Sequence, residues 1–165
     1  MTKVGLIGCG KWGSILRKRL EPISDIKFIC NSRDSYRDKL SRVEWVVVAT
    51  PNETHFNIVK NCILAGKNVF CEKPLTTNIK QAQELFHLAE ENNVNLYVSD
   101  IQNFRPDNFE IFKSNKIIRK KSSSYSKKDI LFNLAYHDFY KLYNYFEDDK
   151  VRSLNVLDKK NTLHF

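Results

Sequence analysis

The stretch Val4-Gly5-Leu6-Ile7-Gly8-Cys9-Gly10-Lys11-Trp12-Gly13 decides the fold. Its apolar start is typical of a buried strand, and a G-x-G-x-x-G turn then leads into a helical pattern. In such a turn Gly8 makes the tight bend, Gly10 lets a pyrophosphate approach the backbone, and Gly13 lets the helix pack closely on the strand. We therefore expect a dinucleotide site formed by Gly8, Cys9, Gly10, Lys11, Trp12 and Gly13. A purely structural glycine turn is the alternative.

Downstream of this turn, short apolar runs alternate with helical patterns. Strands are expected at residues 4–8, 26–30, 45–49, 68–71 and 94–98, and helices at residues 11–20, 53–65 and 78–92. Uninterrupted apolar strands with helices between them indicate a parallel sheet that is covered on both faces. The expected fold class is therefore α/β, a Rossmann-type doubly wound parallel sheet.

The helical patterns differ in length and in their apolar faces. The helix at residues 78–92 is expected to bury one stripe, which consists of Ile79, Ala82, Leu85, Phe86 and Ala89. The stretch at residues 34–44 is too short for a full covering helix. Gly66 is expected to close the preceding helix as its C-cap.

The end of the second expected strand bears on which dinucleotide binds. An NAD site usually places an acidic residue there to bind the ribose 2′-hydroxyl, but the sequence reads Cys30-Asn31-Ser32-Arg33. Ser32 can donate a hydrogen bond to a 2′-phosphate, and the planar guanidinium of Arg33 can pair with it. The segment favours NADP over NAD, and an ordinary exposed loop is the alternative.

Two further motifs follow the third and fourth expected strands. They are Ala49-Thr50-Pro51-Asn52-Glu53-Thr54-His55 and Cys71-Glu72-Lys73-Pro74-Leu75, with Ala65-Gly66-Lys67-Asn68-Val69 between them. Together with the glycine turn, they resemble the Gfo/Idh/MocA oxidoreductases, which are NAD(P)-dependent sugar, sugar-nucleotide and cyclitol dehydrogenases or reductases. The resemblance runs from about Val4 to Pro106, and it implies that residues 1–106 form an NAD(P)-binding Rossmann domain.

The resemblance also implies roles for residues in both motifs. The cofactor-binding loop contains Thr50, Pro51, Asn52 and His55, of which His55 is expected to fix the helix start rather than react. Glu72 and Lys73 match an E-K-P motif whose lysine points at the nicotinamide and the substrate. A lysine ammonium there can hydrogen-bond the reacting oxygen and stabilise the charge that develops on it.

Beyond Pro106 the resemblance is partial. It implies that residues 107–165 are a reduced α+β segment for substrate binding and dimerisation, with strands near residues 116–125 and 151–157. The family's D-x-G-x-H pattern reads here as Asn133-Leu134-Ala135-Tyr136-His137. His137 is expected to act as an acid or base, with a buried structural histidine as the alternative. The candidate substrate contacts are Arg105, Asn133 and His137.

Composition and charge limit the classes of ligand, partner and cellular location that remain. The chain has 165 residues, 27 basic and 19 acidic side chains and a net charge of +8, which favours anionic ligands. Its four cysteines lack zinc-site spacing, so we expect reduced thiols and no metal. No apolar run is long enough to span a membrane and no signal sequence precedes the first strand, so a cytoplasmic protein is expected. A nucleic-acid partner is disfavoured because no recognition motif accompanies the basic residues.

Two functions fit these observations. The first is an NADP(H)-dependent oxidoreductase that transfers a hydride between nicotinamide and a polar carbonyl or hydroxyl substrate, such as a sugar or nucleotide-sugar. The second is a non-catalytic NAD(P)-binding pseudoenzyme that acts as a sensor or docks a partner. In either case the reduced C-terminal segment predicts exposed apolar surface and therefore a homo-oligomer.

Overall fold

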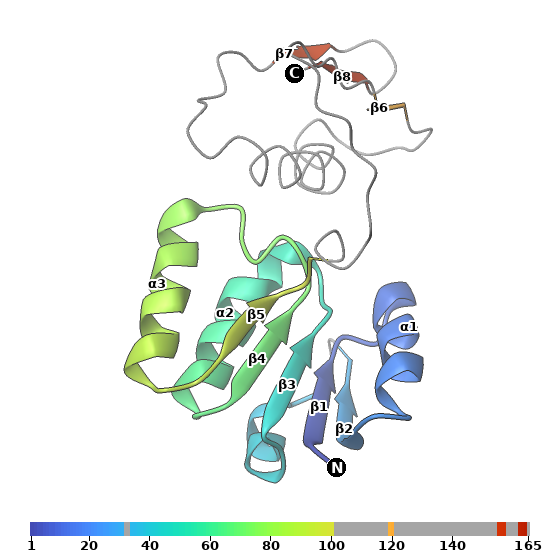
Figure 1. Cartoon of the computed structure of the whole chain (residues 1–165), viewed down its shortest axis with the longest axis vertical. Coiled ribbons are helices and arrows are strands. Elements are labelled where there is room, and N and C mark those ends of the chain that lie inside the picture. The colour runs from blue at the N-terminus through green and yellow to red at the C-terminus, as the bar shows by residue number, and fades with distance from the viewer. Residues whose placement is uncertain (32–33, 101–118, 121–154, 158–161, 165) are drawn as a thin grey trace. The chain divides into compact units, whose positions relative to one another are not determined.

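The first five strands form one parallel sheet in the order β2-β1-β3-β4-β5 (Figure 1). They are β1 (Lys3–Ile7), β2 (Asp25–Cys30), β3 (Trp45–Val48), β4 (Asn68–Cys71) and β5 (Leu96–Val98). The chain runs from β1 outward to β2 and then returns to β3 on the other side of β1. Sheets of this kind bind ligands at that switch point, outside the carboxyl ends of the strands.

The computed structural model describes residues 1–31, 34–100, 119–120, 155–157 and 162–164. The chain divides into two compact units, residues 1–99 and residues 100–165. The parallel sheet and all the helices of the described part belong to the first unit.

Helices cover both faces of the parallel sheet. Helix α1 (Lys11–Leu20) lies on one face, and α2 (Asn52–Leu64) and α3 (Ile79–Glu91) lie on the other (Figure 1). The connection between β2 and β3 is the short 3-10 helix η1 (Arg37–Arg42), as expected from its length. None of the described helices is long and apolar enough to cross a membrane. The predicted doubly wound α/β fold is therefore confirmed.

The larger hydrophobic cluster lies between the sheet and the α2–α3 pair. It joins alternate residues of the strands to one side of each helix, and its fully buried members include Val46, Val48, Val59, Cys62, Ile63, Val69, Cys71 and Leu85. The predicted stripe of α3 is partly wrong, because Ile79 and Phe86 are 73% and 46% exposed. The helix turns Leu85 and Ala89 toward the core, which leaves Ile79 and Phe86 at the edge of the stripe.

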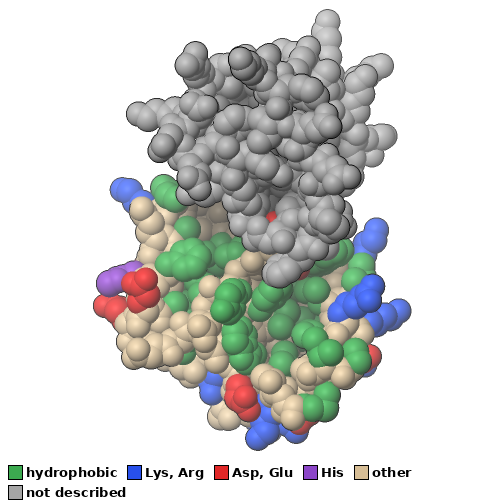
Figure 2. All heavy atoms as spheres, viewed as in Figure 1, with side chains coloured by type: hydrophobic (Ala, Val, Ile, Leu, Met, Phe, Trp, Pro, Cys, Tyr) green, Lys and Arg blue, Asp and Glu red, His purple; other side chains and the backbone are tan. Residues whose placement is uncertain are grey.

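The smaller cluster lies on the α1 face and covers only part of the sheet. Its buried members are Val4, Leu6 and Val47. On this face the rings of Trp45 and Tyr97 stack with centroids 5.9 Å apart, and Tyr97 stays 57% exposed. Figure 2 shows hydrophobic side chains gathered over the strands between α1 and the α2–α3 pair. The expected self-association stays a prediction.

The four cysteines are free thiols, as the sequence predicts. Burial raises the pKa of Cys62 to about 12. Burial also raises the pKa of Cys71, and the neighbouring Glu72 carboxylate adds to the effect. Both groups therefore stay protonated at neutral pH, and they serve as packing in the core.

The second unit contains a small antiparallel sheet in the order β6-β8-β7. Strands β6 (Arg119–Lys120) and β7 (Asn155–Leu157) fall within the two stretches where strands were expected, whereas β8 (Thr162–His164) was not anticipated. The helical pattern around His137 lies outside the described residues.

Candidate functional site

The candidate site is the carboxyl edge of the parallel sheet, where the motif-bearing loops leave neighbouring strands. Four backbone hydrogen bonds hold these strand ends side by side: Gly8 N to Cys30 O (2.8 Å), Ala49 N to Ile7 O (2.8 Å), Glu72 N to Val48 O (2.9 Å) and Ser99 N to Cys71 O (2.7 Å). The glycine turn, the threonine-proline loop and the lysine loop therefore meet at one edge.

The fold requires glycine at two of the three glycine positions of the turn. Gly8 has a φ of +98°, and a Cβ there would lie 2.5 Å from the Ala49 carbonyl oxygen. A Cβ on Gly13 would lie 2.0 Å from the Gly8 carbonyl oxygen, so only glycine permits this contact between helix and turn. A Cβ on Gly10 would meet nothing within 4 Å. The fold thus explains Gly8 and Gly13 but leaves Gly10 without a structural reason.

The first turn of α1 faces this open space around Gly10. Gly10 is the N-cap residue, and no side chain caps the helix, so the leading N–H groups lack intrahelical partners. Lys11 and Trp12 are exposed, Trp12 by 48%. Free N–H groups, a lysine and an open approach at Gly10 suit a phosphate ligand.

The tip of β2 carries an acid that the sequence patterns did not identify. The Asp34 carboxylate accepts a 2.7 Å hydrogen bond from the Asn31 backbone N–H, which brings the acid back to the end of the strand. The predicted 2′-phosphate ligands Ser32 and Arg33 lie outside the described residues. The signal in the sequence is that Asp34 follows the end of β2 by four residues.

The loop after β3 is fixed by short-range contacts of its threonines. The Thr54 hydroxyl lies 2.7 Å from both the Thr50 hydroxyl and the Pro51 carbonyl oxygen. Pro51 precedes α2 as its N-cap residue, and Asn52 is the first helical residue. These contacts hold the predicted cofactor loop against the start of α2.

His55 has no exposed surface and engages both neighbouring loops. Its Nδ1 lies 2.8 Å from the Pro74 carbonyl oxygen, and its Nε2 lies 2.8 Å from the Thr50 carbonyl oxygen. The sequence placed His55 at the helix start but gave no sign of the link to Pro74.

The loop after β4 carries the predicted catalytic lysine. Lys73 is partly exposed and joins Pro74 through a cis peptide bond. The side chain of Glu72 is 7% exposed, and its Oε1 has no hydrogen-bond partner within the described part of the chain. A buried carboxylate oxygen without a donor is costly, so this edge of the sheet can accept a hydrogen bond from a ligand.

Arg105, Asn133 and His137 lie outside the described residues. Within the described residues, no group of three or more His, Cys, Asp or Glu side chains is placed to hold a metal ion.

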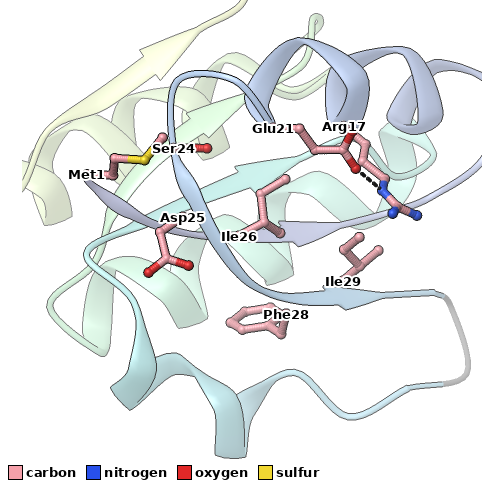
Figure 3. A pocket seen from close by; sticks show the side chains of 8 residues that line it. All are labelled: Met1, Arg17, Glu21, Ser24, Asp25, Ile26, Phe28 and Ile29. Carbon is pink, nitrogen blue, oxygen red and sulfur yellow. Dashed lines mark hydrogen bonds and ion pairs between the residues drawn. The ribbon is translucent and has the colours of Figure 1, made fainter.

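A cavity of about 590 Å³ lies away from these loops. It is lined by Met1, Arg17, Glu21, Ser24, Asp25, Ile26, Phe28 and Ile29 (Figure 3). These residues come from the segment before β1, the end of α1 and the loop that follows it, and strand β2. Two of the lining residues, Arg17 and Glu21, form an ion pair of 2.8 Å. The cavity contains none of the residues predicted to bind the cofactor.

Comparison with known proteins identifies the family of the first unit. Residues 18–100 match the Gfo/Idh/MocA family, described as an oxidoreductase family with an NAD-binding Rossmann fold. A scyllo-inositol 2-dehydrogenase (NADP(+)) from Bacillus subtilis, IolW, is 30% identical over 115 residues, which are 58% of this chain and 32% of that protein.

Solved structures of related enzymes share the fold. A 3-ketoreductase from Actinomadura kijaniata, KijD10, in complex with TDP-benzene and NADP, has a TM-score of 0.60 and 28% identity, covering 64% of this chain and 39% of that one. GenD2 from gentamicin A biosynthesis, in complex with NAD, has a TM-score of 0.56 and 30% identity, covering 59% and 34%. The chain spans about a fifth to a third of the length of the first curated relatives that it matches.

Proposed function

Since the chain belongs to the Gfo/Idh/MocA oxidoreductase family, we propose that it is an NADP(H)-dependent oxidoreductase with a polar carbonyl or hydroxyl substrate. One observation carries this proposal: the glycine turn, the Thr50 loop and Lys73 leave neighbouring parallel strands at the same edge of the sheet. That edge is where doubly wound sheets bind dinucleotides.

The residues at this edge fit a dinucleotide. The backbone at Gly10 is open to close approach, and the leading N–H groups of α1 can donate to a pyrophosphate. Thr50 and Pro51 would lie along the dinucleotide. The unpartnered oxygen of Glu72 would accept a hydroxyl donor from it. Bound there, the nicotinamide supplies the hydride donor or acceptor.

Lys73 is the residue that would act on the substrate. Its ammonium can hydrogen-bond the carbonyl oxygen during reduction and stabilise the negative charge that grows on it. In the reverse direction it can hold the alkoxide as the proton leaves. His137 is proposed as the second proton-transfer group, because it occupies the histidine position of the family pattern.

The proposed preference for NADP rests on Ser32 and Arg33. An arginine at the tip of β2 can pair with a 2′-phosphate, which NAD lacks. Asp34 acts in the opposite direction, since a carboxylate near the strand tip would repel that phosphate and suits a ribose hydroxyl. We propose that Arg33 prevails, because the Asp34 carboxylate is already engaged by the Asn31 N–H.

The proposed substrates are sugars or nucleotide-sugars. Related proteins in the comparisons include an inositol dehydrogenase and a 3-ketoreductase in complex with TDP-benzene. The net charge of +8 is also compatible with an anionic substrate such as a nucleotide-sugar.

A turnover screen tests this function. Purified protein is incubated with NADPH or NADH and a panel of keto-sugars, inosose compounds and nucleotide-linked keto-sugars, and absorbance of the reduced nicotinamide is followed. We expect oxidation of NADPH with at least one panel member. Cofactor binding without oxidation across the panel would contradict the enzyme and support the pseudoenzyme, an outcome that the asparagine at position 133 would help to explain.

A further inference from the structure

His55 is a buried side chain whose two polar atoms both contact backbone carbonyl oxygens. Its ring has no exposed surface. Carbonyl oxygens only accept hydrogen bonds, and a neutral imidazole carries one N–H, so the neutral ring donates to one of the two oxygens at a time and the protonated ring donates to both. With both nitrogens facing the protein backbone at 2.8 Å, the ring has no polar atom available for a ligand. Any contribution of His55 to the site must therefore be indirect.

The two partners of His55 belong to the two loops that flank the expected nicotinamide position. Thr50 follows β3, and Pro74 follows β4, the neighbouring strand. His55 itself lies in the first turn of α2. One rigid ring thus spans from the predicted cofactor loop to the lysine loop.

The residues directly before and after Lys73 are both held by contacts of their backbone. Before the lysine, the Glu72 N–H donates to the Val48 carbonyl oxygen over 2.9 Å. After the lysine, His55 Nδ1 contacts the carbonyl oxygen of Pro74. The backbone is therefore fixed to the sheet at the residue before the lysine and to α2 at the residue after it.

We propose that His55 is a positioning residue: it sets the spacing between the Thr50 loop and the Lys73 loop, and so keeps the lysine ammonium beside the bound nicotinamide. This inference rests on the function proposed for Lys73. Small displacements of such a group lower reaction rates strongly, because the reacting atoms must lie within a narrow range of distances.

Two substitutions separate the two bonds of the ring. The amide nitrogen of asparagine can stand near the position of Nδ1, so His55→Asn keeps the donor to Pro74 and removes the one to Thr50. The longer side chain of glutamine places its amide near Nε2, so His55→Gln keeps the donor to Thr50 and removes the one to Pro74. The exposed His87 on α3, changed to Gln, is the matched control.

Hydrogen–deuterium exchange tests the contacts of His55 with Thr50 and Pro74 in the absence of cofactor and substrate. In His55→Gln we expect amides of residues 72–76 to exchange about tenfold faster, as for one lost hydrogen bond, while residues 50–54 stay near wild type. In His55→Asn we expect the reverse, and in His87→Gln no change in either segment. Equal acceleration of both segments in both His55 variants, or none in either, would overturn the proposal.

A measurement on the wild-type chain covers the case in which the variants do not fold. In ¹⁵N-histidine-labelled protein, a ring N–H proton of His55 should exchange slowly with solvent and show cross-relaxation to residue 50, to residue 74 or to both. Ring protons of His55 that exchange freely with solvent would contradict the two bonds.

The effect on Lys73 is read from its labelling by an acylating reagent, quantified by mass spectrometry with and without NADPH. In wild type and in His87→Gln, saturating NADPH should slow the labelling of Lys73 about tenfold; in His55→Gln and His55→Asn this protection should be lost although NADPH still binds. Retained protection in His55→Gln would refute the positioning role. If wild-type protein binds no NADPH, the proposed function fails, and the exchange data still decide whether His55 sets the loop spacing.

Discussion

Lys73→Met is expected to lower kcat about 100- to 1000-fold, the effect of removing one donor that stabilises developing charge. Methionine keeps the length of the side chain but cannot donate a hydrogen bond or carry charge. Because the glycine turn and the Thr50 loop are unchanged, NADPH affinity should stay within about threefold of wild type. The measurement is steady-state kinetics on a substrate found in the panel, with cofactor affinity measured by fluorescence.

Lys67→Met is the matched control for this prediction. Lys67 directly precedes β4, at the opposite end of the strand from Lys73, and it is also partly buried. Its substitution should leave kcat and cofactor affinity unchanged. Unchanged turnover in Lys73→Met would remove the lysine from the mechanism, whereas equal losses in both variants would indicate a general effect of charge.

Gly10→Ala is expected to weaken NADPH binding without destabilising the fold, whereas Gly13→Ala is expected to destabilise the fold. The methyl group of Gly10→Ala meets nothing in the protein, so the free energy of unfolding should change by less than about 1 kcal/mol. That methyl group would stand where the pyrophosphate approaches, so NADPH affinity should fall about 10- to 100-fold through lost charge-assisted hydrogen bonds.

In Gly13→Ala the added Cβ would lie 2.0 Å from the Gly8 carbonyl oxygen, which is a backbone atom that cannot move away alone. We expect a loss of about 3 kcal/mol in the free energy of unfolding, as for an overpacked core. Denaturant unfolding and NADPH titration of both variants check the pair. A folded Gly10→Ala protein that binds NADPH like wild type would show that the turn has a structural role only.

The order of strands and helices could be predicted from the sequence because it depends on local patterns. Apolar runs such as that of β3 mark buried parallel strands. The C-cap of α2 is Ala65, and Gly66, with a φ of +68°, is the next residue, one position later than expected. The rotation of α3 could not be predicted in full, because five apolar residues cover more of the helix than the core accepts. Only contacts with α2 and the sheet decide that Phe86 stays exposed.

The parts of the site that form sequence motifs next to strand ends could be predicted. Contacts made where the chain bends back on itself, or made to backbone atoms, could not. Asp34 reaches the tip of β2 only because the chain bends back to Asn31. His55 contacts Pro74, 19 residues along the chain, through a carbonyl oxygen that every residue possesses. Neither contact leaves a pattern of side-chain types in the sequence.

The most direct test of a dinucleotide site at the glycine turn is a titration with NADPH and NADH that follows tryptophan emission. Trp12 lies in the turn and is 48% exposed, whereas Trp45, the other tryptophan, begins β3 at the opposite edge of the sheet. We expect NADPH to quench wild-type protein and Trp45→Phe but not Trp12→Phe, with NADH binding about tenfold more weakly because it lacks the 2′-phosphate. Absence of quenching by either cofactor, in a sample shown to be folded, would contradict the site.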